Sequence, residues 1–169
     1  MNKQEFAATV LLNGYRHLGE FDSLQNLRSL HQRRVNGFMA LADQALPAVP
    51  EIPPLDVRRL RAELILEEAL ETINALGFSL GSSSGLVEWN KEPDLIKIVD
   101  GCCDLRVVTT GTLSACGVSD EAVQHAVDCN NLEKFLPGSY KNESGKWIKP
   151  PNHKPPPIEE ILIKQGWKK

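Results

Sequence analysis

Residues 60–76, LRAELILEEALETINAL, place glutamates on an otherwise apolar helical pattern. The leucine and isoleucine spacing predicts a largely buried helix. At 100° per residue, Glu67, Glu68 and Glu71 fall within one arc of about 100°. Like charges at this spacing destabilise a helix. A solvated glutamate face is one interpretation, but such a face normally carries Lys or Arg one turn on, and here positions 71, 72 and 75 are Glu, Thr and Ala. A site that needs the three charges fits better.

A second acidic group follows in DGCCD, residues 100–104. Asp100 and Asp104 face one way on an apolar helix predicted over about 94–116. If this helix packs antiparallel to the glutamate helix, the two acidic groups share one site. Burying carboxylates unpaired costs several kcal/mol each, and a bound cation removes that conflict. All-oxygen ligands favour Mg²⁺, with Mn²⁺ as a substitute, over Zn²⁺. No histidine follows a glutamate at Glu-x-x-His spacing, which argues against a di-iron site.

The composition narrows the class of protein. At 169 residues, with 6% aromatic residues, the chain suits one mainly helical domain with appended ends. A net charge of −3 without a dense Lys/Arg cluster argues against a nucleic acid polymer as partner. Charge interrupts every apolar run before the roughly 20 residues of a membrane span. The four cysteines form no C-x-x-C pair and no signal peptide precedes them, so we expect a reducing cytoplasm, with Cys102 and Cys103 filling a helical core rather than forming a redox pair.

Proline, glycine and helix-capping residues predict where the remaining elements begin and end. Prolines between residues 47 and 54 form an extended connector, and the Gly/Ser-rich stretch 77–94 is a flexible connection without the lysine of a phosphate-binding loop. Helices are predicted over 3–18, about 24–45, from a cap at Asp56 to Leu76, about 94–116, from a cap at Ser119 onward, and over PIEEILIKQG. A hairpin around GSYKNESGKWIK is a weaker prediction. The fold class is all-α: a four-helix-bundle-like core over 31–135, an N-terminal helical extension over 1–30, and a proline-rich C-terminal extension over 136–169.

Carboxylate-held Mg²⁺ typically clamps a phosphorylated substrate. Metal ions held by several carboxylates lower the pKa of an attacking water, and a glutamate that does not bind metal can take the proton of that water. The residues therefore favour phosphoanhydride hydrolysis without a nucleophilic side chain.

EEALE, followed some thirty residues later by a helical aspartate and VVTTGTLSACG, resembles the MazG-like all-α nucleoside triphosphate pyrophosphohydrolases. That superfamily includes phosphoribosyl-ATP pyrophosphohydrolase and dimeric dUTPases. The resemblance runs from about Val35 to Leu162. It includes VNGFM, the spaced prolines, Arg61 six residues before Glu67, NNLEKF and GKWIKPPNHKPPPIEEIL.

The resemblance implies roles for individual residues. The motif E-E-x-x-E maps onto Glu67, Glu68 and Glu71, and the aspartate of E-x-x-D maps onto Asp104. Gly101 stands where the motif has glutamate, and Asp100 could serve instead. The implied metal ligands are Glu67, Glu68, Glu71, Asp100 and Asp104, with Glu67 and Glu68 also catalytic. Val107 replaces a frequent tyrosine, which with Gly101 leaves the number of metal ions open.

Substrate contacts are implied for Asn131 and Lys134, which match an N-x-x-K pattern. Lys146 and Lys149 are further candidates, although solvated loop lysines are commoner. Arg61 is expected to contact substrate or to pair with Glu68 or a neighbouring subunit. We interpret His125 as structural.

The sequence therefore predicts a Mg²⁺-dependent pyrophosphohydrolase that cleaves a nucleotide between its α and β phosphates and assembles as a homodimer or homotetramer. The alternative is a nucleotide-binding or protein-interaction module with a decayed site, which Gly101 would explain. Base and sugar preference are not predicted.

Overall fold

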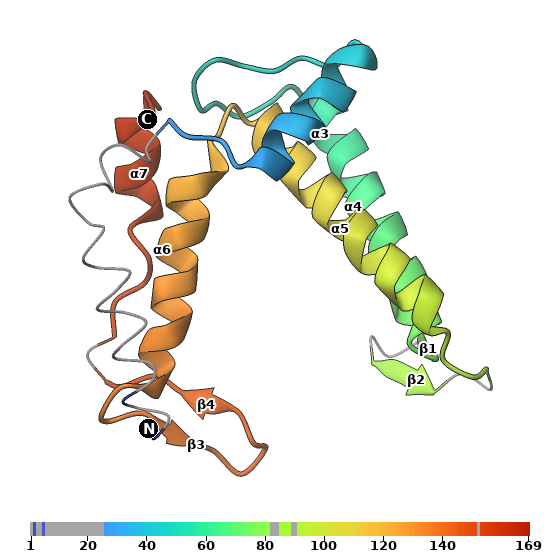
Figure 1. Ribbon diagram of the computed structural model, residues 1–169, viewed down its shortest axis with the longest axis vertical. Helices are drawn as coiled ribbons and strands as arrows, with labels where there is room; N and C mark the ends of the chain where they lie inside the picture. The colour runs from blue at the N-terminus through green and yellow to red at the C-terminus, as the bar shows by residue number, and fades with distance from the viewer. Residues whose placement is uncertain (1, 3–4, 6–25, 82–84, 89–90, 152) are drawn as a thin grey trace. The chain divides into compact units, whose positions relative to one another are not determined.

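The computed structural model describes residues 2, 5, 26–81, 85–88, 91–151 and 153–169. Its helices are α3 (Leu30–Leu41), α4 (Leu55–Ala75), α5 (Leu95–Ala115), α6 (Asp120–Leu132) and α7 (Ile158–Lys164), with a 3-10 turn, η1 (Glu133–Phe135). Strands are confined to short hairpins, so the all-α prediction is confirmed (Figure 1). The helix predicted over 3–18 lies outside the described residues. Among the described residues, no helix is both long enough and apolar enough to cross a membrane.

The chain forms two compact units, which we describe separately. Residues 30–118 are the three-helix unit, with α3, α4 and α5. Residues 119–169, together with the segment before residue 30, are the C-terminal unit. The division predicted from the sequence, at residues 30 and 135, stays a prediction.

A small apolar core joins α3 to α5 in the three-helix unit. Val35 and Met39 from α3 pack with Ala115 from α5. The side chain of Gln32 is fully buried and donates hydrogen bonds to Ser114 Oγ (3.1 Å) and to the Val118 carbonyl (2.7 Å). Because a buried amide without partners would be costly, these two bonds fix the rotation of α3 against the end of α5.

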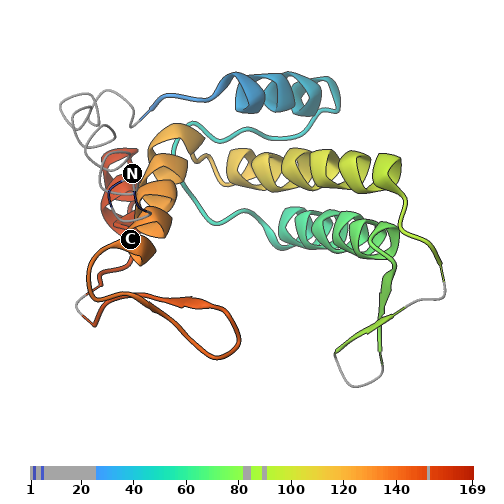
Figure 2. The same ribbon diagram turned by 60° about the horizontal axis from the view of Figure 1, so that its bottom comes forward.

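Helices α4 and α5 lie side by side over their whole length (Figure 2). Two glycines of α5 permit this contact. A Cβ at Gly101 would overlap the Thr72 hydroxyl and lie 3.2 Å from Thr72 Cβ, and a Cβ at Gly111 would lie 3.0 Å from Arg61 Nη1. Thr72 of α4 meets Gly101 of α5, and Arg61, earlier on α4, meets Gly111, later on α5, so the helices are antiparallel. This is the arrangement under which the two acidic groups were expected to share one site.

The helix ends show where local prediction succeeds and fails. α5 begins as predicted, with the Asp94 carboxylate accepting hydrogen bonds from the N–H groups of Ile96 and Lys97. The cap predicted at Asp56 is wrong, because α4 already begins at Leu55 and Asp56 lies within its first turn. The proline connector instead runs back to the end of α5, where Glu51 N donates to the Cys116 carbonyl at 3.0 Å.

The stretch predicted as a flexible connection contains a hairpin. Strands β1 (Phe78–Leu80) and β2 (Leu86–Glu88) pair antiparallel, with Phe78 opposite Glu88 and Leu80 opposite Leu86. Strands of three residues are too short for alternation to reveal in the sequence. The adjacent Cys102 and Cys103 also differ from expectation, since both are exposed on α5 rather than core-filling; all four cysteines are free thiols.

In the C-terminal unit, α6 packs on α7 through Ala122, Ala126 and Ile161. Ser119 precedes α6 as predicted, but its hydroxyl makes no capping bond. Instead, Gln165 accepts from Ser119 N and donates to the Ser119 carbonyl, each at 2.9 Å. The weakly predicted hairpin is present as β3 (Tyr140–Lys141) and β4 (Trp147–Ile148), and Trp147 packs edge-on against Phe135.

The glycine contact gives a stability prediction. Gly101→Ala should lower the free energy of unfolding by about 1–3 kcal/mol, because a methyl group there overpacks the contact with Thr72. Chemical denaturation measures this change. Gly37 in α3 is the matched control, since a Cβ there meets no atom within 4 Å. Gly37→Ala should be neutral or stabilise by up to about 1 kcal/mol. Equal effects of the two substitutions would contradict the contact.

Candidate metal and substrate site

The antiparallel register brings the predicted acids to one level of the three-helix unit. Glu68 lies one turn before the α4 residue that contacts Gly101, and Asp104 lies one turn after Gly101 on α5. These two acids are therefore level. The same register brings Glu71 level with Asp100.

A pocket of about 360 Å³ opens along this level. Three of the five predicted metal ligands line it, namely Glu71, Asp100 and Asp104. The other lining residues are Asn74, Ala75, Lys91, Glu92, Asp94, Lys97 and Gly101. The polar members of that second group were missed by sequence reasoning. Lys97 could have been found, because it precedes Asp100 by three residues and Asp104 by seven, and so shares their helix face.

Glu68 is the electrostatic centre of the acids. Burial raises the pKa of this half-buried carboxyl, and the negative charges of Asp104, Glu71, Glu67 and Asp100 raise it further. All four other predicted ligands thus act on Glu68, so the five carboxylates form one electrostatic cluster, which we call the acid cluster.

The acid cluster suits a hard divalent cation by its chemistry. Its donors are all carboxylate oxygens, which Mg²⁺ prefers, and a cation would relieve the repulsion that raises the pKa of Glu68. As the side chains lie, however, no three His, Cys, Asp or Glu groups in the described residues converge closely enough to hold one ion. The metal ligands therefore stay a prediction that requires side-chain rotation on a fixed backbone.

Position 101 has a structural explanation. The motif places glutamate there, but Gly101 is buried against Thr72, where no side chain fits. Asp100, one residue earlier, is exposed and lines the pocket. Glycine at 101 is thus a packing requirement of this helix pair, and the prediction that Asp100 replaces the motif glutamate as a metal ligand stays a prediction.

Arg61 lies away from the acid cluster. Only 7% of it is exposed, burial lowers its pKa, and its Nη2 donates to Gln44 Oε1. It packs on Gly111, two helical turns from Glu68. Among the described residues it makes no ion pair with Glu68, so that expected pairing is corrected: in this protomer Arg61 ties α4 to the loop after α3 and to α5.

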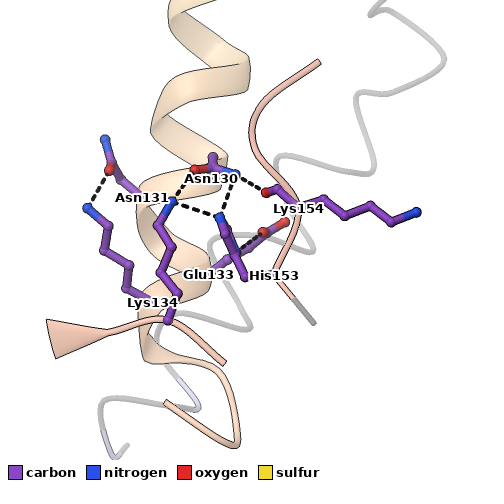
Figure 3. A network of polar contacts seen from close by, with 7 residues as sticks. Asn130, Asn131, Glu133, Lys134, His153 and Lys154 are labelled. Atoms are coloured by element: carbon purple, nitrogen blue, oxygen red, sulfur yellow. Dashed lines mark hydrogen bonds and ion pairs between the residues drawn. The ribbon is translucent and has the colours of Figure 1, made fainter. Parts of the chain in front are cut away.

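The predicted substrate residues of the C-terminal unit have different surroundings. Asn131 is exposed, and its Oδ1 accepts a hydrogen bond from Lys134 Nζ at 2.7 Å (Figure 3). The N-x-x-K spacing therefore brings an amide and an ammonium together. Lys146 is exposed on the β3–β4 hairpin, where its backbone N–H donates to Asn142 Oδ1.

Lys149 is engaged in a polar network. It donates to Asn130 Oδ1 (2.8 Å) and to His153 Nε2 (2.7 Å) (Figure 3). The Asn130 amide also donates to His153 Nε2 and to the Lys154 carbonyl, and His153 Nδ1 lies 3.1 Å from Glu133 Oε2. With two donors at Nε2, His153 carries its proton on Nδ1 toward Glu133. The network anchors the proline-rich segment to α6, so Lys149 has structural partners here, and its substrate contact stays a prediction.

A comparison with known protein families shows to which family the chain belongs. The sequence profile of phosphoribosyl-ATP pyrophosphohydrolase matches residues 35–131, more than half of the chain. The chain belongs to the phosphoribosyl-ATP pyrophosphohydrolase family. This family is part of the MazG-like nucleotide pyrophosphohydrolase superfamily, as the sequence motifs indicated. No curated protein matches the chain in a direct comparison.

The family match contains α4 and α5, the whole acid cluster and Asn131. It ends before Lys134 and, of the polar network, includes Asn130 alone, so the resemblance noted up to Leu162 is matched only as far as residue 131. The nucleotide pyrophosphohydrolase fold of the family is thus the scaffold on which the acid cluster lies.

Repulsion at Glu68 predicts an effect of pH on stability. Because its pKa is raised in the folded state, charged Glu68 opposes folding at neutral pH, and this cost disappears as pH falls and the carboxyl is protonated. Without divalent ions, Glu68→Gln should therefore raise the midpoint of thermal unfolding at pH 7 by roughly 2–4 °C, and by much less near pH 4. Differential scanning calorimetry measures the midpoint of thermal unfolding at each pH.

The exposed Glu143 of the hairpin loop is the control, and Glu143→Gln should change little at either pH. If Glu68→Gln raises the unfolding midpoint equally at low pH, the cause is packing. If it does not raise the midpoint at pH 7, the repulsion is contradicted.

Proposed function

We propose that this chain is a Mg²⁺-dependent nucleotide pyrophosphohydrolase that cleaves a (d)NTP or related nucleotide between its α and β phosphates. The products are a nucleoside monophosphate and pyrophosphate. One observation carries the proposal: in a chain of the phosphoribosyl-ATP pyrophosphohydrolase family, the α4–α5 pair gathers five carboxylates at one level beside a pocket.

Glu67, Glu71, Asp100 and Asp104 would hold the cation, with Glu68 shared between metal and water. When bound, Mg²⁺ would neutralise phosphate oxygens and lower the pKa of a bound water. Of the two candidate bases, Glu68 is half-buried and level with Asp104 of α5, whereas Glu67 is exposed. We therefore assign the role of base to Glu68.

The position of cleavage follows from what the site offers. A γ-phosphate hydrolase usually holds the α and β phosphates with a glycine-rich loop ending in Lys-Ser/Thr, and GSSSGLVEWNK has no lysine at that place. In the proposed reaction, water oxygen attacks the α phosphorus while Glu68 takes its proton. The bond from the α phosphorus to the bridging oxygen breaks, and that oxygen leaves with its electron pair as part of pyrophosphate. The cation would meet the charge of the leaving group, and the substrate contact predicted for Lys134, which belongs to the C-terminal unit, stays a prediction.

Assembly as a homodimer or homotetramer is part of the proposal. Large apolar side chains on α4 and α5 are exposed in the protomer: Leu66 is 57% and Ile96 83% exposed. Exposed apolar surface of this extent is typical of an interface. The four free thiols agree with a reducing, cytoplasmic setting.

A second candidate is a binding module with a decayed site, which the lack of three converged ligands in the described residues favours. A Mg²⁺ or Mn²⁺ titration separates the two, since a decayed site should bind either ion poorly.

The test of the proposal is product identity. The protein is incubated with Mg²⁺ and a panel of standard and modified (d)NTPs, and products are resolved by ion-exchange chromatography. We expect monophosphate and pyrophosphate together from the earliest time points. Initial diphosphate with orthophosphate would overturn the cleavage position, and no turnover of any nucleotide would favour the binding module.

Glu71→Gln tests the role of the acid cluster in the same assay. It removes a charge at the pocket while keeping the side-chain shape, so kcat should fall by about 100-fold or more with an unchanged circular dichroism spectrum. Glu143→Gln should retain full activity. Normal turnover of Glu71→Gln at saturating Mg²⁺ would show that the acid cluster is not the catalytic centre.

A further inference from the structure

The proline-rich segment between β4 and α7 cannot be held in place by a ladder of backbone hydrogen bonds. Its sequence, KPPNHKPPP, is rich in prolines, which have no N–H group to donate. At its far end, Ile161 of α7 packs in the small core with α6. Between β4 and α7, side-chain contacts therefore decide whether the segment stays on α6.

Apolar packing holds this segment only weakly. A pocket of about 880 Å³ lies between α6 and the last three prolines, Pro155, Pro156 and Pro157. Ala126 and Cys129 line it from the helix. Apolar contact stabilises only where surfaces meet and exclude water, so the hydrogen bonds of the polar network carry most of the attachment.

His153 is the centre of that attachment (Figure 3). Its Nε2 accepts from Lys149 Nζ at 2.7 Å and from Asn130 Nδ2 at 3.0 Å, and its Nδ1 lies 3.1 Å from Glu133 Oε2. The His153 side chain is 9% exposed and Asn130 is 8% exposed, so these bonds are largely shielded from solvent. We call Asn130, Glu133, Lys149 and His153 the latch.

The latch requires a neutral imidazole. Because two donors meet at Nε2, this nitrogen carries no proton. A proton taken from solvent onto Nε2 removes the acceptor of both bonds and places an imidazolium against the Lys149 ammonium. The bond to Glu133 becomes charge-assisted and strengthens. His153 would therefore remain on Glu133 while Lys149 and Asn130 separate from it.

The surrounding charges do not cancel this repulsion. Among the described residues, the ionisable side chains that face His153 are Glu133 from η1 and Lys149 from the segment itself. The Lys154 ammonium points away from the ring (Figure 3). Earlier on α6, His125 and Cys129 contact each other at 3.6 Å. Within this set, one carboxylate faces two cations once the imidazole is protonated.

We propose that His153 is a proton-operated switch, which fastens the proline-rich segment to α6 when neutral and releases Lys149 and the segment when protonated. Histidine is the side chain that ordinarily changes charge between about pH 5 and pH 8. The inference goes beyond the proposed function, since no residue of the latch belongs to the acid cluster.

The tautomer of His153 provides the first test. Long-range ¹H–¹⁵N NMR spectra of the full chain at about pH 7.5 show which ring nitrogen carries the proton. His153→Gln removes the signal and so assigns it. We expect the proton on Nδ1. A neutral ring with its proton on Nε2 would overturn the inference, because that nitrogen could not accept from Lys149.

Hydrogen exchange measured by mass spectrometry follows the release. Protection factors, corrected for the intrinsic exchange rate, are compared at about pH 7.5 and pH 5 for peptides that cover residues 147–158. In this range the His153 N–H donates to the Pro150 carbonyl at 3.0 Å. Wild type should lose protection here by about tenfold or more at the lower pH, whereas peptides of α3 should change little.

Two substitutions of histidine locate the titrating group. Gln at position 153 keeps an acceptor near the place of Nε2 and cannot be protonated, so His153→Gln should be protected equally at both pH values. His125→Gln is the matched control on α6 and should respond to pH as wild type does. Equal protection of wild type at both pH values, or a full response in His153→Gln, would overturn the inference.

Lys149→Gln tests the mechanism if His153→Gln fails to hold the segment at either pH. Glutamine keeps a donor toward Nε2 and removes the positive charge. The segment should then be protected at about pH 7.5 and lose clearly less protection than wild type at about pH 5. A loss as large as that of wild type would contradict the repulsion between the imidazolium and Lys149.

Discussion

The contact between Gly101 and Thr72 sets the geometry on which the candidate site depends. At this point the hydroxyl of Thr72 donates to the Glu68 carbonyl of its own helix at 2.7 Å, and Gly101 has no side chain to meet it. The two longest helices can therefore approach closely with one register. That register brings Glu68 level with Asp104 and Glu71 level with Asp100. A side chain at position 101 would separate the helices where the acids need to be close.

The short distances between the carboxylates of the acid cluster do not stabilise the fold. Four carboxylates raise the pKa of Glu68 beyond what its burial does. This repulsion opposes folding in the free protein. Under the proposed function, bound cations would remove it. Local features that conflict with stability are expected at functional sites.

Much of this architecture was predictable from the sequence because it depends on local patterns. Apolar periodicity identified α4 and α5, and the repeated spacing of acids indicated a shared site on the condition that the two helices pack antiparallel. Failures occurred where tertiary contacts decide. The sequence indicated that Gly101 replaces a metal ligand of the motif, whereas in the structure Gly101 packs against Thr72. The surroundings of Arg61 and Lys149 were likewise not predicted, since the first packs on Gly111 and the second bonds Asn130 and His153, which are distant in sequence.

The central claim is that the backbone of α4 and α5 prepares a cation site that side-chain rotation completes. A crystal structure of the protein soaked in Mn²⁺, with anomalous diffraction recorded near the manganese edge, tests it most directly. We expect manganese between the two helices, bound by Glu71, Asp100 and Asp104 together with Glu67 or Glu68, and an unchanged contact at Gly101. Manganese bound elsewhere, or Asp100 turned away with water in its place, would contradict the account.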